Sequence, residues 1–467
     1  MCAWYSGPSA RGRGTARLAV AALVSGLVTA GVLAAAGPAA AEETPQSPGG
    51  ATATLGGLKV YGTAVVHDDT GDHQIAAGLF EMSVDGGGTL QTYCVDLHNP
   101  TQRDAKYHET PWSGTSLAAN KDAGKIRWIL QNSYPQVNDL AALAAKAGVR
   151  NLTEQDAAVG TQVAIWRYSD GADVDAVDPE AEKLADYLEK SARDLPEPRA
   201  SLTLDPPAVS GHPGERIGPV TVRTDASSVT LTPSVGAATS GVRIVDGNGE
   251  EITSVANGSQ VFFDVPEDSA DGTATLTAQA STTVPVGRAF TSDSRSQTQI
   301  LAGSSESTVA ATARVTWAAQ GAIPALSATK NCAKGGLDIT AVNKGDEPFA
   351  FELMGTRHTI AAGTSRTVTI PLQEDQAYDF TITGPGGQGQ RFTGVLDCET
   401  QGSPVGTTAR TLSAPSPLTV GAPSADTNLA DTGGTDTTPM IAAGGLSLLV
   451  LGATVLSIVR KQKATQD

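Results

Sequence analysis

Cys94 is the first residue of this chain whose side chain suggests chemistry. It lies in the run TLQTYCVDL (89–97), whose pattern predicts a β-strand. A cysteine in this setting packs as a small inert side chain, joins another chain through a disulfide, or acts as a nucleophile. For the third use His98 is the nearest base in the sequence. It shares the face of Cys94 but stands roughly 13 Å away along an extended strand.

Gln162 is the second such residue. The segment TEQDAAVGTQVAIWRYSD (153–170) has the pattern of a helix, and Thr153 with Asp156 resembles a capping box at its start. The apolar positions of this helix fall on one stripe that also contains a polar amide: Ala158, Gln162, Ile165 and Trp166. A buried amide without a partner costs roughly 1–3 kcal/mol. The fold must therefore supply a group that meets Gln162.

Together, YCVDL (93–97) and GTQVAIWRYSDG (160–171) resemble the thioester domain of bacterial surface adhesins. That family carries a Cys just after an aromatic residue or Leu, and a downstream helix with a TQxAIW-like motif. The matching residues here are Tyr93, Cys94, Thr161, Gln162, Val163, Ala164, Ile165 and Trp166. The resemblance covers residues 57–198, under a third of the chain, and implies an α+β thioester domain there.

The resemblance also implies a reaction. Cys94 Sγ and the side-chain carbonyl of Gln162 are expected to form an internal thioester with loss of ammonia. An amine on a target surface, usually a lysine, then attacks this carbonyl because a thiolate is a good leaving group. The reaction needs no metal and no cofactor, and each molecule reacts once, so we expect a single-turnover covalent binder and not an enzyme. Tyr93 and Trp166 are expected to exclude water, and Thr161 to hydrogen-bond near the carbonyl.

Both ends of the chain carry patterns of export and surface attachment. Three arginines precede an apolar stretch and a run of small residues ending at Ala41. This layout predicts a secretory signal peptide over residues 1–41, with an uncleaved membrane anchor as the alternative. At the other end, LADTG (429–433) is followed by an apolar run of spanning length (439–459) and then by RKQK.

This order of features resembles a sortase cell-wall sorting signal of the LAxTG type over residues 429–467. The pentapeptide consists of Leu429, Ala430, Asp431, Thr432 and Gly433. The resemblance implies cleavage between Thr432 and Gly433 and linkage of Thr432 to peptidoglycan. A plain single-pass membrane protein is the alternative.

Between the ends, the composition changes from mixed to all-β. Residues 57–198 combine predicted strands (58–66, 75–84, 89–97) with predicted helices (121–134, 153–170, 178–195). Short, regularly spaced strand patterns predict a β-sandwich over residues 199–320 and a smaller one over 325–399. Residues 400–428 are rich in Pro, Ser, Thr, Gly and Ala, and predict a disordered wall-spanning linker.

Three cysteines remain if Cys2 leaves with the signal peptide. Cys332 and Cys398 stand at the two ends of the last predicted domain. An oxidising compartment favours a disulfide between them over two buried free thiols. Cys94 is then left without a partner.

Charge narrows the set of partners. The chain has 32 Lys and Arg against 49 Asp and Glu, a net charge of −17, which argues against nucleic acid as a partner.

The sequence predicts a multidomain protein: an α+β thioester domain, two all-β sandwich-like domains, a disordered stalk and a C-terminal transmembrane sorting helix. The predicted function is covalent adhesion to an amine-bearing surface protein or matrix ligand, with sortase and peptidoglycan as partners of the anchor. A non-covalent adhesive or structural wall protein and a secreted cysteine hydrolase are the alternatives.

Overall fold

The computed structural model describes residues 49–234, 237 and 240–399. The predicted signal peptide (1–41), linker (400–428) and sorting signal with its pentapeptide (429–467) lie outside the described residues. Within the described residues, no helix has both the length and the apolar character needed to cross a membrane.

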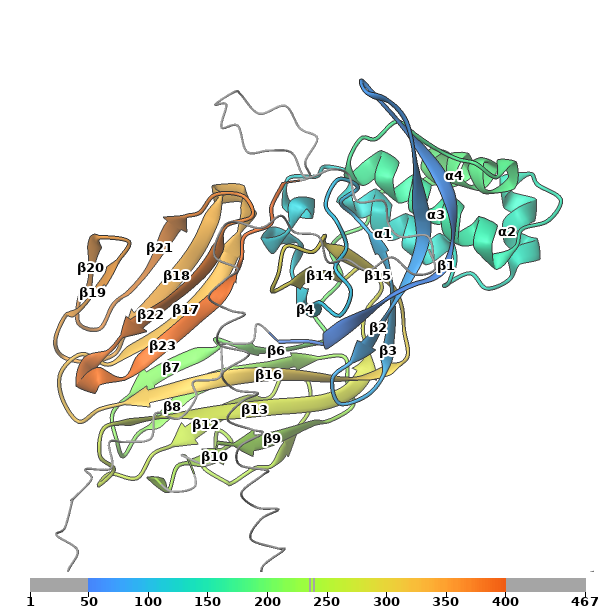
Figure 1. Cartoon of the computed structure of the whole chain (residues 1–467). Coiled ribbons are helices and arrows are strands. Elements are labelled where there is room, and N and C mark those ends of the chain that lie inside the picture. The colour runs from blue at the N-terminus through green and yellow to red at the C-terminus, as the bar shows by residue number, and fades with distance from the viewer. Residues whose placement is uncertain (1–48, 235–236, 238–239, 400–467) are drawn as a thin grey trace, which may run out of the picture. The chain divides into compact units, whose positions relative to one another are not determined.

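A seven-stranded sheet forms the first part of the fold. Its strands are β1 (Thr52–Asp68), β2 (Gly71–Val84), β3 (Thr89–Cys94), β4 (Lys106–Thr110), β5 (Val174–Ala176), β14 (Ala289–Ser292) and β15 (Gln299–Ser304). The strand order is β2-β3-β15-β14-β4-β1-β5, and β1 also pairs with β2. Six of the strands therefore close into a ring, and β5 pairs with β1 outside it (Figure 1).

The ring includes two strands from a distant part of the chain. β14 and β15 fall within the range 199–320, which the sequence assigns to a separate β-sandwich. β14 pairs antiparallel with β4, and β15 pairs antiparallel with β3. This hairpin fills the place between β3 and β4 and supplies the ladder partners that both strands need. The first predicted domain thus shares its sheet with residues beyond its predicted end at 198.

A buried carboxylate joins three segments beside the ring. Glu109 accepts hydrogen bonds from the backbone N–H of Ala51 at 3.2 Å and of Ser201 at 2.9 Å. Its Oε1 also lies 2.8 Å from Nε of Arg288, which is itself buried. A buried charge is tolerated when it is paired and hydrogen-bonded in this way. Because Ala51 takes part and Gly50 bridges to Ala310, the chain is ordered before the predicted domain start at residue 57.

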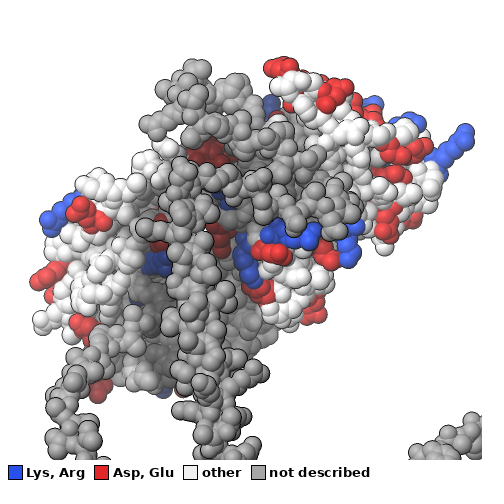
Figure 2. All heavy atoms as spheres, viewed as in Figure 1, with Lys and Arg blue, Asp and Glu red and all other residues white. Residues whose placement is uncertain are grey.

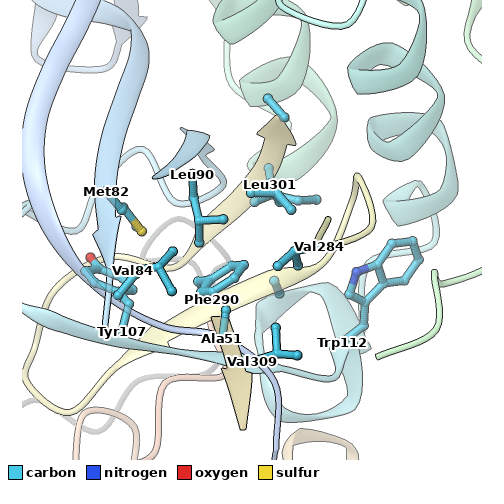
Figure 3. Close-up of a cluster of buried hydrophobic side chains, with 14 of the residues drawn as sticks. Ala51, Met82, Val84, Leu90, Tyr107, Trp112, Val284, Phe290, Leu301 and Val309 are labelled. Carbon is cyan, nitrogen blue, oxygen red and sulfur yellow. The ribbon is translucent and has the colours of Figure 1, made fainter. Parts of the chain in front are cut away.

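Apolar side chains from several strands pack inside this part of the fold. Figure 3 shows Leu90 of β3 and Leu301 of β15 around Phe290 of β14, with Met82 and Tyr107 beside them. All five are buried. Leu90 shares its side of β3 with Thr92 and Cys94 because strand side chains alternate.

Four α-helices pack beside the ring: α1 (Ala123–Asn132), α2 (Leu140–Ala147), α3 (Glu154–Ser169) and α4 (Pro179–Ser191). Two short 3₁₀ helices precede them, Trp112–Gly114 and Ser116–Ala118. α2 was not among the predicted helices. α3 contacts β1, β2, α1 and α4, so it is buried on all sides from Ala157 to Trp166 and not along one stripe.

The remaining strands form two further groups. The first contains a four-stranded sheet, order β10-β12-β8-β6, and a five-stranded sheet, order β11-β9-β13-β16-β7. Its strands are β6 (Leu202–Asp205), β7 (Ala208–Gly211), β8 (Arg216–Thr224), β9 (Val229–Pro233), β10 (Arg243–Val245), β11 (Ser254–Val255), β12 (Gln260–Asp264), β13 (Gly272–Thr283) and β16 (Glu306–Trp317).

The second group has a three-stranded sheet, order β17-β18-β21, and two hairpins, β19-β20 and β22-β23. Its strands are β17 (Pro324–Asn331), β18 (Gly336–Asn343), β19 (Phe349–Leu353), β20 (Thr356–Ile360), β21 (Ser365–Pro371), β22 (Ala377–Thr383) and β23 (Gly389–Val395), with 3₁₀ turns at Cys332–Lys334 and Pro385–Gly387. Cys332 and Cys398 are joined by a disulfide. This group has its own apolar core, whereas the ring, its helices and the first group share one.

Candidate functional site

Cys94 and Gln162 meet at the end of β3. The pairing of β2 with β3 stops at Phe80 and Thr92, so Cys94 lies beyond the last ladder partner that β2 provides. The carboxamide of Gln162, from α3, occupies this place. Its Oε1 accepts the Cys94 N–H at 3.0 Å, and its Nε2 donates to the Cys94 carbonyl at 2.9 Å. The buried amide that the sequence left without a partner is therefore satisfied by the backbone of the cysteine.

The residues just before Cys94 and Gln162, Tyr93 and Thr161, both contact the segment that follows α1. The Tyr93 hydroxyl donates to the carbonyl of Tyr134 at 2.9 Å. The Thr161 hydroxyl donates to the Ala157 carbonyl at 2.6 Å and lies 2.6 Å from the Ser133 hydroxyl. Thr161 was expected to hydrogen-bond near the reactive carbonyl, but the donor found on the Gln162 carbonyl is the Cys94 N–H. Both residues thus help to set the position of the site.

The site is closed to bulk water. Gln162 is fully buried and Cys94 is 2% exposed. Trp166, one turn after Gln162 on α3, is 4% exposed, and its indole N–H has no hydrogen-bond partner among the described residues. Burial of this kind protects a reactive acyl bond from hydrolysis by bulk water.

The Cys94 thiol faces polar groups on β15 and on the loop after β3. Gln299 Nε2 lies 3.2 Å from Cys94 Sγ. Burial raises the pKa of the Cys94 thiol to about 12, while hydrogen bonds from Gln299 and Thr101 oppose this rise. The thiol is therefore protonated at neutral pH, and Cys94 is free and buried in the structure.

Two carboxyl groups, buried Asp96 and half-buried Asp170, lie near the end of β3. Burial raises the pKa of Asp96 to about 8 and that of Asp170 to about 7. Asp170 accepts a hydrogen bond from the Leu97 N–H at 3.1 Å, whereas Asp96 accepts one from the side-chain amide of Asn99. The other oxygen of Asp96 has no hydrogen-bond partner among the described residues. Their negative charges add to the rise in the Cys94 pKa.

This arrangement suits acyl transfer. The Cys94 N–H points at the oxygen on which negative charge develops when a nucleophile attacks the Gln162 carbonyl carbon, which is the role of an oxyanion-hole donor. Both ends of the Gln162 carboxamide are hydrogen-bonded to Cys94, whose thiol would attack it. These bonds restrict the orientation of the carboxamide relative to the thiol. The predicted alternative base, His98, has its pKa lowered by burial and is not one of the thiol's hydrogen-bond partners identified above.

Sequence reasoning paired Cys94 with Gln162 but missed the groups that contact the thiol. Gln299 was placed in the β-sandwich range, and no role was given to Thr101 or Thr92. One signal was available: Gln299 is a polar amide in the apolar strand QILAGS, which is the argument that singled out Gln162. Its position opposite Cys94 depends on strand pairing over 205 residues, which the sequence does not specify.

Comparison with known proteins gives two family matches. The thioester domain family matches residues 91–194, which contain Cys94, Gln162 and all four helices. The family of the bacterial phospholipase C C-terminal domain matches residues 308–395. No curated protein matches. Residues 91–194 are therefore similar to a thioester domain, and β-rich segments follow them.

Two solved structures of thioester proteins are similar to this chain at low identity. The Bacillus anthracis TIE protein is 15% identical over 74% of this chain and 63% of its own length, with a TM-score of 0.26. The thioester domain of the Enterococcus faecium TIE86 protein is 18% identical over 60% of this chain and 99% of its own, with a TM-score of 0.28. This chain thus spans less than two thirds of the first of these proteins.

Proposed function

We propose that this protein is a surface adhesin that binds amine-bearing targets covalently through a thioester between Cys94 and Gln162. One observation carries the proposal. The Gln162 carboxamide is buried and bonded at both ends to the backbone of Cys94, at 3.0 and 2.9 Å. A structural glutamine does not need a buried thiol on the residue that it contacts, whereas an acyl-transfer site does.

The bond changes can be written in full. In the first step Cys94 Sγ bonds to the Gln162 carbonyl carbon, the C–N bond of the amide breaks, and the thiol proton leaves with ammonia. In the second step the nitrogen of a target amine bonds to the same carbon and the C–S bond breaks. A proton from the amine goes to the Cys94 sulfur. The target ends in an amide bond to Gln162, and the site is used once, so the protein acts as a single-turnover binder.

The rest of the proposal concerns place and partner. The predicted signal peptide and sorting signal support export, processing by sortase and linkage through Thr432 to peptidoglycan. The expected target is a lysine on a surface protein or matrix ligand. Figure 2 shows acidic and basic side chains interspersed on the described part of one face, which fits a protein partner better than nucleic acid.

Intact mass measurement tests the thioester. We expect purified residues 42–428 to have a mass about 17 Da below the sequence value, after subtraction of about 2 Da for the disulfide. Methylamine should then add about 31 Da, because it opens the thioester without releasing any part of the chain. A native mass at the sequence value, with no gain from methylamine, would contradict the proposal.

Matched variants identify the reacting residues. Cys94→Ala and Gln162→Glu should each lack the mass deficit and the methylamine product. Gln279→Glu, the same change at an exposed position of β13, should keep both. Repeated turnover of a peptide or ester by the wild type, lost in Cys94→Ala, would instead support the hydrolase. A folded wild-type protein without the 17 Da mass deficit would support the alternative of a non-covalent adhesin.

A further inference from the structure

The thiol of Cys94 is contacted by a strand that reaches the ring from far along the chain. Cys94 and Gln299 lie directly opposite each other in the β3–β15 ladder. The next ladder bond runs from the Val95 N–H to the Thr298 carbonyl, which makes Cys94 and Gln299 a pair whose backbones are not bonded to each other. Side chains approach most closely in such pairs. This explains the 3.2 Å contact between Gln299 Nε2 and Cys94 Sγ.

A hydroxyl fixes which end of Gln299 faces the sulfur. Thr92 Oγ1 donates to Gln299 Oε1 at 2.9 Å, and both residues are buried. With its oxygen engaged by Thr92, the Gln299 amide presents its N–H₂ group to Cys94. The diagonal position of Thr92, two residues before Cys94 on the same side of β3, makes this contact possible.

A second donor approaches the thiol from the loop after β3. The Thr101 side chain interacts with the Cys94 thiol and lowers its pKa. Gln297, just before β15, donates its side-chain amide to Thr101 Oγ1. Because this oxygen already accepts from Gln297, the hydroxyl hydrogen is free to point at the sulfur. Gln299, which begins β15, is therefore one donor to the thiol, and Gln297, just before β15, orients the other.

We propose that Gln299 and Thr101 stabilise the thiolate of Cys94 as it leaves during acyl transfer, with Gln299 as a catalytic residue in direct contact with the sulfur. The proposal deepens the function proposed above and rests on it. When the amine attacks Gln162, the C–S bond breaks and the electron pair moves to Sγ. The Gln299 N–H and the Thr101 O–H donate to this sulfur until the proton from the amine reaches it. Because the sulfur is buried, bulk water does not reach it to do so.

The test compares the rates at which thioester variants react. Gln299→Met keeps the size of the side chain but removes the donor, and Gln299→Glu keeps the shape but places an acceptor beside the sulfur. We expect the second-order rate constant with methylamine to fall about 10-fold for Met and about 100-fold for Glu. Thr101→Val should lower it by up to about 10-fold. Gln279→Glu, exposed on β13, is the matched control and should react as the wild type does.

Hydrolysis of the same thioester by water separates stabilisation of the leaving group from simple packing. Both reactions expel the same thiolate, so loss of the donor should slow both. If Gln299 only fills space, its replacement loosens the site and admits water, and hydrolysis becomes faster. Equal or faster rates in folded variants that carry the 17 Da deficit would overturn the role of Gln299.

The two proposals fail in distinguishable ways. A wild-type protein without the mass deficit overturns both of them. A wild type with the deficit, together with variants that react as it does, overturns only the role of Gln299 and Thr101. If Gln299→Glu does not fold, as judged by its melting transition, the Met and Thr101→Val variants carry the comparison.

Discussion

Burial at Cys94 affects the two directions of the proposed reaction differently. With the thiol pKa raised to about 12 by burial, the freed cysteine stays protonated at neutral pH. A protonated thiol is a poor nucleophile, so burial slows its attack on an amide carbonyl, both when the thioester first forms and when the freed thiol meets the new amide on Gln162. The same burial makes expulsion of the thiolate costly, which is why donors on the sulfur matter. The site therefore favours a lasting bond over rapid reaction.

Asp96 gives a prediction about pH at the residue scale. Its pKa is raised to about 8 by burial, so the folded protein holds a proton that the unfolded chain has lost by about pH 5. This contribution to stability is full below the unfolded pKa and is lost as the pH rises towards 8. Loss of this contribution lowers the free energy of unfolding by at most about 1.4 kcal/mol for each pH unit of the rise.

Urea unfolding between pH 5 and pH 8 measures this effect. Asp96→Asn keeps the shape and the acceptor for Asn99 but does not ionise, so it should lose less stability over this range than the wild type. Asp69→Asn, at an exposed turn, should follow the wild-type curve. Parallel curves for the wild type and Asp96→Asn would show that Asp96 is ionised in the folded protein.

At the scale of elements, α3 places Gln162 through two separate features. Its middle is buried among β1, β2, α1 and α4. Its start is fixed by a capping box in which Asp156 N–H donates to Thr153 Oγ1 at 3.1 Å and Thr153 N–H donates to Asp156 Oδ2 at 2.8 Å. Gln162 lies more than two turns from this cap, so the packed middle and not the cap should control the site.

Removal of the cap should therefore lower stability and leave the chemistry intact. We expect Thr153→Ala to reduce the free energy of unfolding by about 1 kcal/mol, because the first turn loses a partner for its N–H groups. Thr153→Ser retains the hydroxyl and should stay close to the wild type. The methylamine rate of both variants should be unchanged; a large fall in Thr153→Ala would show that motion of the first turn reaches Gln162.

At the scale of the whole molecule, the ring depends on segments that the family match does not include. The match ends at residue 194, but β14 and β15 lie at residues 289–304. Without them β3 and β4 each expose an unpaired edge, and Leu90 loses its contacts with Phe290 and Leu301 (Figure 3). Unpaired apolar edges of this kind lead to aggregation.

A fragment that ends at the predicted domain boundary should therefore fail to fold. We expect residues 42–198 to aggregate or to lack a cooperative melting transition, whereas residues 42–320 fold and show the 17 Da deficit. The longer fragment contains the whole of the shared apolar core, which runs from Ala51 to Trp317. A well-folded, methylamine-reactive 42–198 fragment would contradict this view of the ring.

The sequence predicted the local features of this fold better than its pairings. The strands around residues 58–66, 75–84 and 89–97 and three of the four helices correspond to elements of the structure, because periodicity and caps are local. The short, alanine-rich α2 was missed because its apolar periodicity is weak. The first domain was predicted to end at residue 198, so the return of the chain to the ring at residue 289 was not predicted.

The site divides in the same way. Cys94 and Gln162 stood out because a lone cysteine and a buried amide need explanations and because their motifs resemble a known family. Gln299 belongs to an ordinary strand pattern, and its place opposite Cys94 follows from ladder register alone. Register between strands so far apart is set by the packing of the whole ring, and no local signal in the sequence specifies it.

The late position of β15 also sets an order of events in time. A ribosome makes Cys94 and Gln162 long before Gln299, because synthesis runs from the N-terminus. The ring stays open until residue 304 has appeared, and closure over so many residues is slow. During this interval the cysteine has neither its strand partner nor its donor. Under the proposed function, the thioester site is complete only after most of the chain has been made, and the protein can bind a target covalently only from that point on.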